Sequence, residues 1–152
     1  MQKPNKLSAP SDAEPLPAYE LDAQVGFLMR VAMQRHTSIF MANMIEDLTQ
    51  TQFAVLAKLH EVGPTSQNQL GRLVYLDAAT IKGVVDRLVL RGFISTGSDP
   101  TDRRRRAVSL TEAGAHAVAA AIRVAADVTA RTLRPLTADE QRVLVRLLKK
   151  IT

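Results

Sequence analysis

Closely spaced signals for the beginning and end of helices mark the chain between residues 49 and 92. A Thr or Ser followed three residues later by Gln can form a capping box, in which each side chain pairs with a free backbone group of the other residue. An Asp can cap a helix alone, and Gly-Pro or Arg-Gly ends one. Three short helices in succession are therefore predicted. Their signals are Thr49 with Gln52, Gly63-Pro64, Ser66 with Gln69, Asp77, and Arg91-Gly92. Their expected inward faces are Phe53, Leu56 and Leu59, then Leu70 and Leu73, then Ile81, Val84, Val85 and Leu88.

A small β-hairpin is predicted directly after these helices. Phe93 to Thr96 and Ala107 to Leu110 have the composition of short strands. The residues from Gly97 to Asp102 between them favour a turn. The order of short helices and hairpin is that of a winged helix-turn-helix.

Positive charge is concentrated in the same segment. Between Gln67 and Leu110, eight basic side chains stand against four acidic ones, an excess that makes up most of the chain's net charge of +5. Four of the eight are consecutive, and alternation along a strand would point Arg104 and Arg106 one way and Arg103 and Arg105 the other. Asp102 could brace the Arg104 guanidinium with two hydrogen bonds. This distribution favours nucleic acid as the partner, although a run of cations is usually a solvated cluster.

The helix that Asp77 opens has the features of a DNA-reading helix. Small side chains at its start would let the backbone approach base edges, and its free amide groups favour a phosphate. Thr80 could contact a base edge, and Lys82 a guanine or a phosphate; the alternative is an ordinary solvated helix with one lysine. Hairpin arginines would follow phosphates or enter the minor groove. The predicted DNA-binding residues are Ser66, Gln67, Ala78, Ala79, Thr80, Lys82, Arg87, Asp102, Arg103, Arg104, Arg105 and Arg106.

Long apolar helices are predicted on both sides of this segment. From Glu20 to Glu46 no proline interrupts two neighbouring apolar stripes at helical spacing. The stripes are Leu21, Val25, Leu28, Ala32, Ile39 and Asn43, and beside them Met29, Met33, His36, Phe40 and Met44. Thr111 caps an alanine-rich helix to about Arg131, and Thr137 with Glu140 caps a last helix. The apolar residues near the C-terminus predict a second subunit, the alternative being an intramolecular bundle. They are Leu133, Leu136, Leu144, Leu147, Leu148 and Ile151.

Several classes of protein are excluded by composition. The chain has no cysteine, which excludes disulfides, thiolate metal sites and thiol catalysis. Residues 1–17 hold four of the seven prolines and predict a flexible tail, with no apolar signal-peptide core. No run approaches the roughly 18 apolar residues of a membrane span. No glycine-rich phosphate loop, metal-ligand cluster or Ser–His pair is present. We expect a cytoplasmic protein without enzymatic activity, metal, cofactor or membrane contact.

Three stretches resemble the MarR family of transcriptional regulators. Asp99 to Arg104 with Leu110 to Gly114 is similar to the family's wing, Leu48 to Phe53 to the start of its second helix, and Thr80 to Gly92 to its recognition helix. The resemblance covers roughly Leu21 to Ile151. It implies a mainly α fold in one domain, residues 18–152, with a winged helix-turn-helix at about 50–111 and dimerisation helices at about 18–46 and 112–152. It also implies a homodimer that binds double-stranded DNA at a pseudo-palindromic operator.

The resemblance further implies a small-molecule effector. Members of the family often bind small aromatic carboxylates in a cleft between the dimer helices and the winged module. Methionines and Phe40 could form the apolar wall of such a cleft here, and basic side chains its donors. The predicted ligand-binding residues are Met29, Arg30, Met33, Arg35, His36, Phe40 and Met44. The first helix and its Arg35-His36 pair look most like the branch that regulates breakdown of nicotinic acid and related aromatic acids. The implied effector is a hydroxynicotinate that releases a repressor from DNA.

Less specific interpretations of the same residues remain. A lone histidine such as His36 is often only a partly exposed helix residue, and methionine at helical spacing often fills a core. The protein could also be a DNA-binding regulator without a small-molecule effector. Titration with aromatic acids distinguishes these cases.

Overall fold

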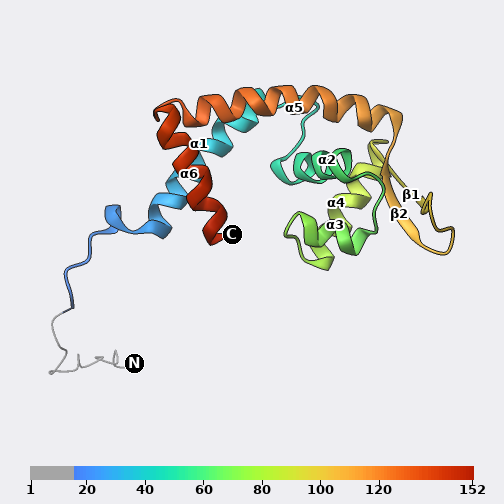
Figure 1. Ribbon diagram of the computed structural model, residues 1–152, viewed down its shortest axis with the longest axis horizontal. Helices are drawn as coiled ribbons and strands as arrows, with labels where there is room; N and C mark the ends of the chain where they lie inside the picture. Colours follow the sequence, from blue (N-terminus) through green and yellow to red (C-terminus); the bar gives the residue numbers. More distant parts are fainter. Residues whose placement is uncertain (1–15) are drawn as a thin grey trace, which may run out of the picture.

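A computed structural model of the protein describes residues 16–152; residues 1–15, which hold most of the tail expected at 1–17, lie outside the described part. Within residues 16–152 the chain forms a short 3-10 turn, six α-helices and one two-stranded sheet. In Figure 1, α5 runs along the top, α1 and α6 extend from one end of it, and α2 to α4 gather with the hairpin at the other end. The elements are η1 (Leu21–Ala23), α1 (Val25–Asn43), α2 (Gln50–Val62), α3 (Gln67–Leu73), α4 (Ala78–Leu90), β1 (Ile94–Ser98), β2 (Arg106–Leu110), α5 (Glu112–Leu133) and α6 (Ala138–Ile151). The prediction of a mainly α, winged helix-turn-helix fold is confirmed.

Side-chain caps set the helix starts, largely as predicted. The Thr49 hydroxyl accepts the Gln52 amide and the Gln52 side chain accepts the Thr49 amide, which completes the capping box of α2. Thr137 and Glu140 form the same box at α6. At α3, Ser66 accepts from Gln69 but no reciprocal bond forms, so the predicted box is only half correct. The exposed Gln69 side chain can satisfy its hydrogen bonds with water instead.

The first long helix is shorter than the predicted Glu20 to Glu46. Gln24 is extended and its side chain donates to the Glu20 carbonyl, which separates η1 from α1. At the other end, Glu46 and Asp47 have φ values of 56° and 48°. Left-handed residues cannot continue a right-handed helix, and they reverse the chain toward α2. The Arg91 guanidinium donates to the Glu46 carbonyl and supports this turn.

The hairpin pairs β1 and β2 in antiparallel register, with Ile94 opposite Leu110 and Ser98 opposite Arg106. β1 begins one residue later than predicted and extends through Gly97 and Ser98, which the sequence assigned to the turn. Val108 also exchanges backbone hydrogen bonds with Thr65, N to O at 2.7 Å and 3.1 Å. The hairpin is therefore attached to the segment between α2 and α3.

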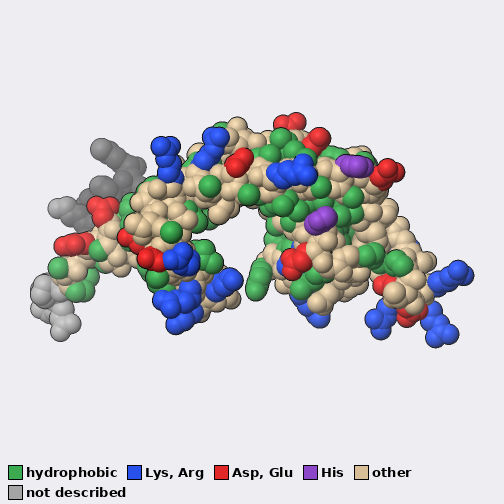
Figure 2. All heavy atoms as spheres, turned by 45° about the horizontal axis from the view of Figure 1, so that its top comes forward, with side chains coloured by type: hydrophobic (Ala, Val, Ile, Leu, Met, Phe, Trp, Pro, Cys, Tyr) green, Lys and Arg blue, Asp and Glu red, His purple; other side chains and the backbone are tan. Residues whose placement is uncertain are grey.

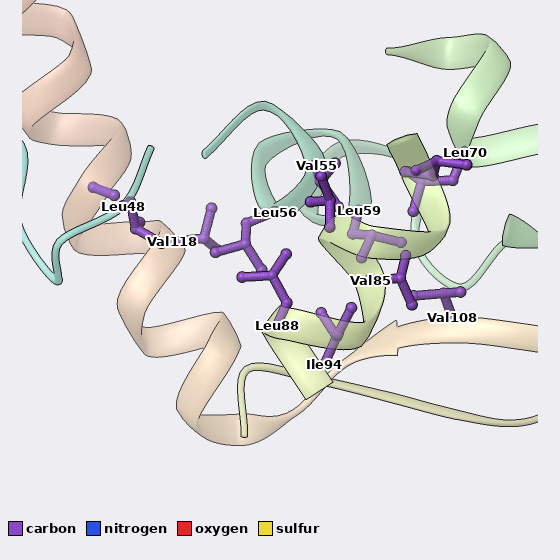
Figure 3. Packing of buried hydrophobic residues seen from close by; sticks show 13 residues of the cluster. Leu48, Val55, Leu56, Leu59, Leu70, Val85, Leu88, Ile94, Val108 and Val118 are labelled. Carbon is purple, nitrogen blue, oxygen red and sulfur yellow. The ribbon is translucent and has the colours of Figure 1, made fainter. Parts of the chain in front are cut away.

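The hydrophobic core lies within the winged end of the molecule (Figure 3). It joins α2, α3, α4, both strands and the first half of α5, and most of the predicted inward residues lie in it. Phe53 and Leu73, expected to be inward, are only partly buried; Phe53 packs against the outside of this cluster, and Leu73 is not part of it. The core residues are Leu48, Val55, Leu56, Leu59, Leu70, Ile81, Val84, Val85, Leu88, Ile94, Val108, Val118 and Ala121.

The opposite end of the molecule buries little. Phe40 is the only buried residue of α1, and no residue of α6 is buried. Within the described chain, α6 contacts the other elements only sparsely. Large apolar side chains of both helices are consequently exposed, among them Leu28, Met33, Leu147 and Ile151. No helix among the described residues has the length and apolar character needed to cross a membrane.

The start of α5 is fixed against the turn that precedes β1. Thr111 donates through its amide to the Phe93 carbonyl (3.0 Å) and through its hydroxyl to the Gly92 carbonyl (2.6 Å). Its hydroxyl oxygen also accepts the Gly114 amide at 3.0 Å. Gly114 is pressed so closely against this turn that an added Cβ would lie 1.8 Å from the Phe93 carbonyl oxygen. This contact requires glycine.

We therefore expect Gly114→Ala to destabilise the protein by about 3 kcal/mol, because the methyl group overlaps backbone that cannot move aside. Urea unfolding followed by circular dichroism at fixed protein concentration measures the change. Gly83→Ala, in the interior of α4, is the matched control, since a Cβ there meets nothing within 4 Å and alanine favours a helix. Equal unfolding midpoints for Gly114→Ala and the unmodified protein would contradict the close contact.

Candidate DNA-binding surface and ligand pocket

Asp77 shapes the start of α4, the helix predicted to read DNA. Its Oδ1 accepts the Thr80 amide and its Oδ2 accepts the Thr80 hydroxyl, both at 2.8 Å. These bonds, first from the Thr80 amide and then from its hydroxyl, lower the pKa of Asp77. The Thr80 hydroxyl proton is therefore engaged by the cap, which leaves the hydroxyl oxygen as an acceptor and the methyl group as an apolar contact. A methyl group suits the thymine methyl better than a polar base edge.

The two faces of α4 differ sharply. Ile81, Val84, Val85 and Leu88 are buried, whereas the predicted DNA-binding residues of this helix are exposed. Lys82 pairs with Asp86 at 2.6 Å, so it is not a free cation in this structure. The exposed residues of α4 that were predicted to bind DNA are Ala78, Ala79, Thr80, Lys82 and Arg87.

α3 packs closely on α4 in the manner of a helix-turn-helix. A Cβ at Gly71 would lie 3.1 Å from an Ile81 methyl group and 3.2 Å from the Leu76 carbonyl oxygen. The turn between the helices includes Tyr75 at a φ of 57°. Ser66 and Gln67, also predicted to contact DNA, stand at the start of α3, where the Ser66 hydroxyl caps the helix. Both residues thus belong to a helix start whose helix packs on α4 through Gly71.

Carboxylates organise the tip of the hairpin. Asp99 Oδ1 accepts the Thr101 hydroxyl and amide, each at 2.7 Å, and the Asp102 amide at 3.3 Å. The bonds from Thr101, its hydroxyl first, lower the pKa of Asp99. The Asp99 amide donates to the Arg105 carbonyl at 2.8 Å and closes the loop. These are local bonds that fix the backbone of a loop otherwise free to move.

The predicted bracing of Arg104 by Asp102 is wrong. Asp102 Oδ1 accepts the backbone amide of Arg104 at 3.0 Å, and its Oδ2 lies 3.6 Å from Nε of Arg105. The predicted alternation is also wrong, because only Arg106 lies on β2 and Arg103 to Arg105 form the turn before it. The Asp99 and Asp102 turns curl this part of the chain, which prevents a regular strand.

All four arginines of the hairpin are exposed. Figure 2 shows Lys and Arg side chains projecting from the tip of the hairpin at the right-hand end of the molecule. Of these four arginines, only Arg105 has an acidic partner within the described part of the chain, and that ion pair is exposed and weak. The tip therefore combines a fixed backbone with exposed positive charge, which suits contact with a polyphosphate.

A pocket of about 340 Å³ lies where α1, α2 and α5 meet. This volume is in the range of small-molecule sites. Apolar side chains make most of its wall, and His36, Gln50 and Thr129 are its polar members. It is lined by Met33, His36, Phe40, Gln50, Phe53, Ala125, Val128 and Thr129.

Only three of the seven predicted ligand-binding residues, Met33, His36 and Phe40, line this pocket. Met44 packs against the core instead, and Met29 is exposed. Arg30 lies over the Phe27 ring, its guanidinium carbon 5.2 Å from the ring centroid. Arg35 donates to the Thr132 carbonyl at 2.6 Å and to the Arg131 carbonyl at 3.1 Å. It satisfies the free carbonyls that end α5, which explains why it does not enter the pocket.

Five lining residues escaped the sequence analysis: Gln50 and Phe53 of α2 and Ala125, Val128 and Thr129 of α5. The periodicity of α1 identified its own lining residues, but it carries no information about which segments pack opposite them. Phe53 was recognised only as a core residue. Its ring lies 6.0 Å from that of Phe40, between centroids.

Hydrogen bonds orient His36 within the pocket. Its Nδ1 lies 2.9 Å from the Thr132 hydroxyl oxygen, and that hydroxyl donates to the Val128 carbonyl at 2.8 Å. Because the hydroxyl proton is already used, the short contact requires Nδ1 to carry a proton and donate. In neutral His36, Nε2 is consequently an acceptor, and it becomes a donor only when the ring is protonated.

A second, larger hollow of about 660 Å³ follows the exposed face of α6. Its lining mixes Leu133, Ala138 and Val145 with the basic residues Arg142, Arg146, Lys149 and Lys150. It belongs to the helix that packs least on the rest of the chain, and we interpret it as an unpartnered face. Among residues 16–152, no three His, Asp or Glu side chains stand close enough together to hold a metal ion.

Comparison with known proteins agrees with this geometry. Residues 48–105 match the MarR family. The chain is 39% identical over 151 residues to the HTH-type transcriptional repressor NicR of Pseudomonas putida. The aligned residues cover 99% of this chain and 94% of NicR.

Two similar solved structures concern regulation by a ligand and binding to DNA, respectively. One concerns the regulation of DNA binding of BpsR from Bordetella bronchiseptica by 6-hydroxynicotinic acid; it is 35% identical, with a TM-score of 0.82 over 89% of this chain and 97% of that one. The other is a cysteine-to-serine mutant of Escherichia coli MarR in complex with operator DNA, 27% identical, with a TM-score of 0.75 over 85% of this chain and 95% of that one. The family resemblance drawn from the wing and helix motifs is thus confirmed, and the chain belongs to the MarR family of DNA-binding transcriptional regulators.

Proposed function

We propose that the protein is a repressor that binds a pseudo-palindromic operator as a homodimer and is released by a small aromatic carboxylate such as a hydroxynicotinate. The observation that carries this proposal is the pocket between α1, α2 and α5, which has an apolar wall around His36. The similarity to NicR supports repression, and the similarity to BpsR supports a hydroxypyridine carboxylate as effector. The protein would act in the cytoplasm, where the DNA is, and without catalysis.

The DNA-binding residues proposed are those of α3, α4 and the hairpin. α4 would enter the major groove with Ala78, Ala79 and Thr80 foremost, and Arg87 and Lys82 would contact phosphates. Lys82 would exchange its pairing with Asp86 for a phosphate, which costs little because the ion pair is exposed. Arg103 to Arg106 would follow the backbone or reach the minor groove.

We expect Arg104→Ala to weaken operator binding by about 1–3 kcal/mol, because the exposed guanidinium loses its phosphate or base contact. Gel shift at several salt concentrations measures this, and the slope of log affinity against log salt should fall by about 1. Arg123→Ala removes the same charge from the exposed surface of α5 and serves as control. An unchanged dissociation constant at fixed salt would remove the hairpin from the DNA interface.

The homodimer is proposed from the exposed apolar faces of α1 and α6. A 14-residue helix with no buried residue is marginal in water unless another surface covers it. We propose the two terminal parts, about residues 18–46 and 112–152, as the dimerisation region and about 50–111 as the DNA-binding unit of one domain. Two such units about 34–36 Å apart would enter successive major grooves.

Leu147→Glu should convert the dimer to a monomer, because it places a charge in the centre of the apolar face of α6. Light scattering coupled to gel filtration would give half the mass of the unmodified protein, and operator affinity would fall with it. His60→Glu, an exposed change on α2, should leave the mass unchanged. A monomeric unmodified protein, or a Leu147→Glu dimer, would refute this interface.

Release by ligand follows from the position of the pocket. A molecule held there contacts α1 and α5 on one side and α2 of the DNA-binding unit on the other. It would weaken DNA binding to the extent that it prefers a spacing of the two units that misfits the operator. His36 would accept from the ligand when neutral, or donate to its carboxylate when Nε2 is protonated.

We expect His36→Ala to raise the concentration of 6-hydroxynicotinate that releases DNA by at least tenfold, while operator affinity without ligand stays nearly constant. A charge-assisted hydrogen bond lost from the pocket accounts for a change of this size. Gel shift with graded ligand measures it, and His60→Ala is the control because His60 is exposed on α2. If no aromatic acid releases the unmodified protein, it is a regulator without this effector.

A further inference from the structure

Gln50 lines the pocket, and the nitrogen of its side-chain amide is enclosed without a hydrogen-bond partner in the described part of the chain. It is the first residue of α2, partly buried, and it lines the cavity opposite α1. Its Nε2 is buried and has no hydrogen-bond partner among residues 16–152. Thr49 and Gln52 alone form the cap of α2, so Gln50 has no role in starting the helix.

A buried amide without a partner is a local cost that proteins rarely keep. An unmade hydrogen bond at a buried donor destabilises the fold, whereas an apolar side chain of similar size would not. This unpaired donor belongs to a residue that lines the pocket and not to a residue of the packed core. No hydrogen bond from residues 16–152 holds the amide in its orientation, so it can turn about its side-chain torsions toward a ligand without losing such a bond.

We propose that Gln50 recognises a ring lactam, the oxo tautomer of a hydroxypyridine carboxylate, and so sets the specificity of the pocket; this inference rests on the proposed function. A primary amide presents a donor, Nε2, beside an acceptor, Oε1. A six-membered lactam presents the complementary pair, a carbonyl beside a ring N–H. The two groups can form a pair of parallel hydrogen bonds, which a benzene ring with a hydroxyl group cannot do.

The location of Gln50 also gives this contact a consequence for DNA binding. Gln50 belongs to α2, which packs in the core with α4, whereas His36 belongs to α1 and is bonded to Thr132 of α5. A ligand held by both residues would tie the DNA-binding unit to the α1 and α5 end of the molecule. The bonds of the ligand to Gln50 and His36 would thus both recognise the ligand and set the spacing of the two DNA-binding units.

Two ligands of equal shape test this assignment. 6-Hydroxynicotinate and 4-hydroxybenzoate both carry an oxygen para to a carboxylate, but only the first has a ring N–H next to that oxygen. Calorimetric titration of the full-length protein should show tighter binding of 6-hydroxynicotinate. Gln50→Leu should reduce that affinity by about 10- to 100-fold and change the affinity for 4-hydroxybenzoate by less than about threefold.

Gln69→Leu is the matched control, because Gln69 is exposed on α3 and does not line the pocket. A second readout needs no ligand: Gln50→Leu should unfold at an equal or higher temperature than the unmodified protein, since it removes an unpaired buried donor. This result also shows that the variant folds.

Each outcome bears on a different claim. Unchanged binding of 6-hydroxynicotinate by Gln50→Leu, or an equal loss for both ligands, overturns the role of Gln50 and leaves the effector proposal intact. If the unmodified protein binds neither acid, the effector proposal fails and this inference fails with it. Lower thermal stability of Gln50→Leu would show that the side chain supports the fold instead.

Discussion

One continuous helix, α5, is shared by both ends of the molecule, and the other features depend on it. Its first half belongs to the core of the winged end through Val118 and Ala121. Its last turn accepts hydrogen bonds from Arg35 of α1. A helix of 22 residues is about 33 Å long and stiff. The DNA-binding unit is thus held at one end of this stiff helix, and α1 at the other. A change in the position of the DNA-binding unit relative to α1 must therefore occur where α2 meets α1.

The pocket lies at that junction. Its walls come from α1, α2 and α5, and its polar groups differ in how well they are satisfied. His36 is oriented by Thr132, whereas the buried nitrogen of Gln50 has no hydrogen-bond partner in the described part of the chain. Sequences usually avoid such local conflicts, and the exceptions gather at functional sites. This contrast distinguishes the pocket from the tightly packed core only a few residues away along α2.

The surface proposed for DNA separates the groups that hold the backbone from the groups that contact a partner. Asp77 and Asp99 are engaged by backbone amides and hydroxyls, and both have lowered pKa values for that reason. Arg103 to Arg106 are exposed, and of these four only Arg105 pairs with an acidic side chain from residues 16–152. The acidic residues of this basic segment therefore have a structural role, because they order the backbone that carries the arginines.

Local sequence determined the elements, and tertiary packing determined the site. Caps such as Thr49, Asp77 and Thr111 act within four residues, so their helices could be predicted, as could the buried face of α4. The same reasoning failed for Asp102 and Arg104, where several short-range bonds compete and geometry decides which one forms. It could not find Gln50 or Val128 in the pocket, or withdraw Arg35 from it, because these depend on which helices meet. Periodicity describes one helix at a time, and a cavity between three helices exists only once the long-range packing of the chain has placed them together.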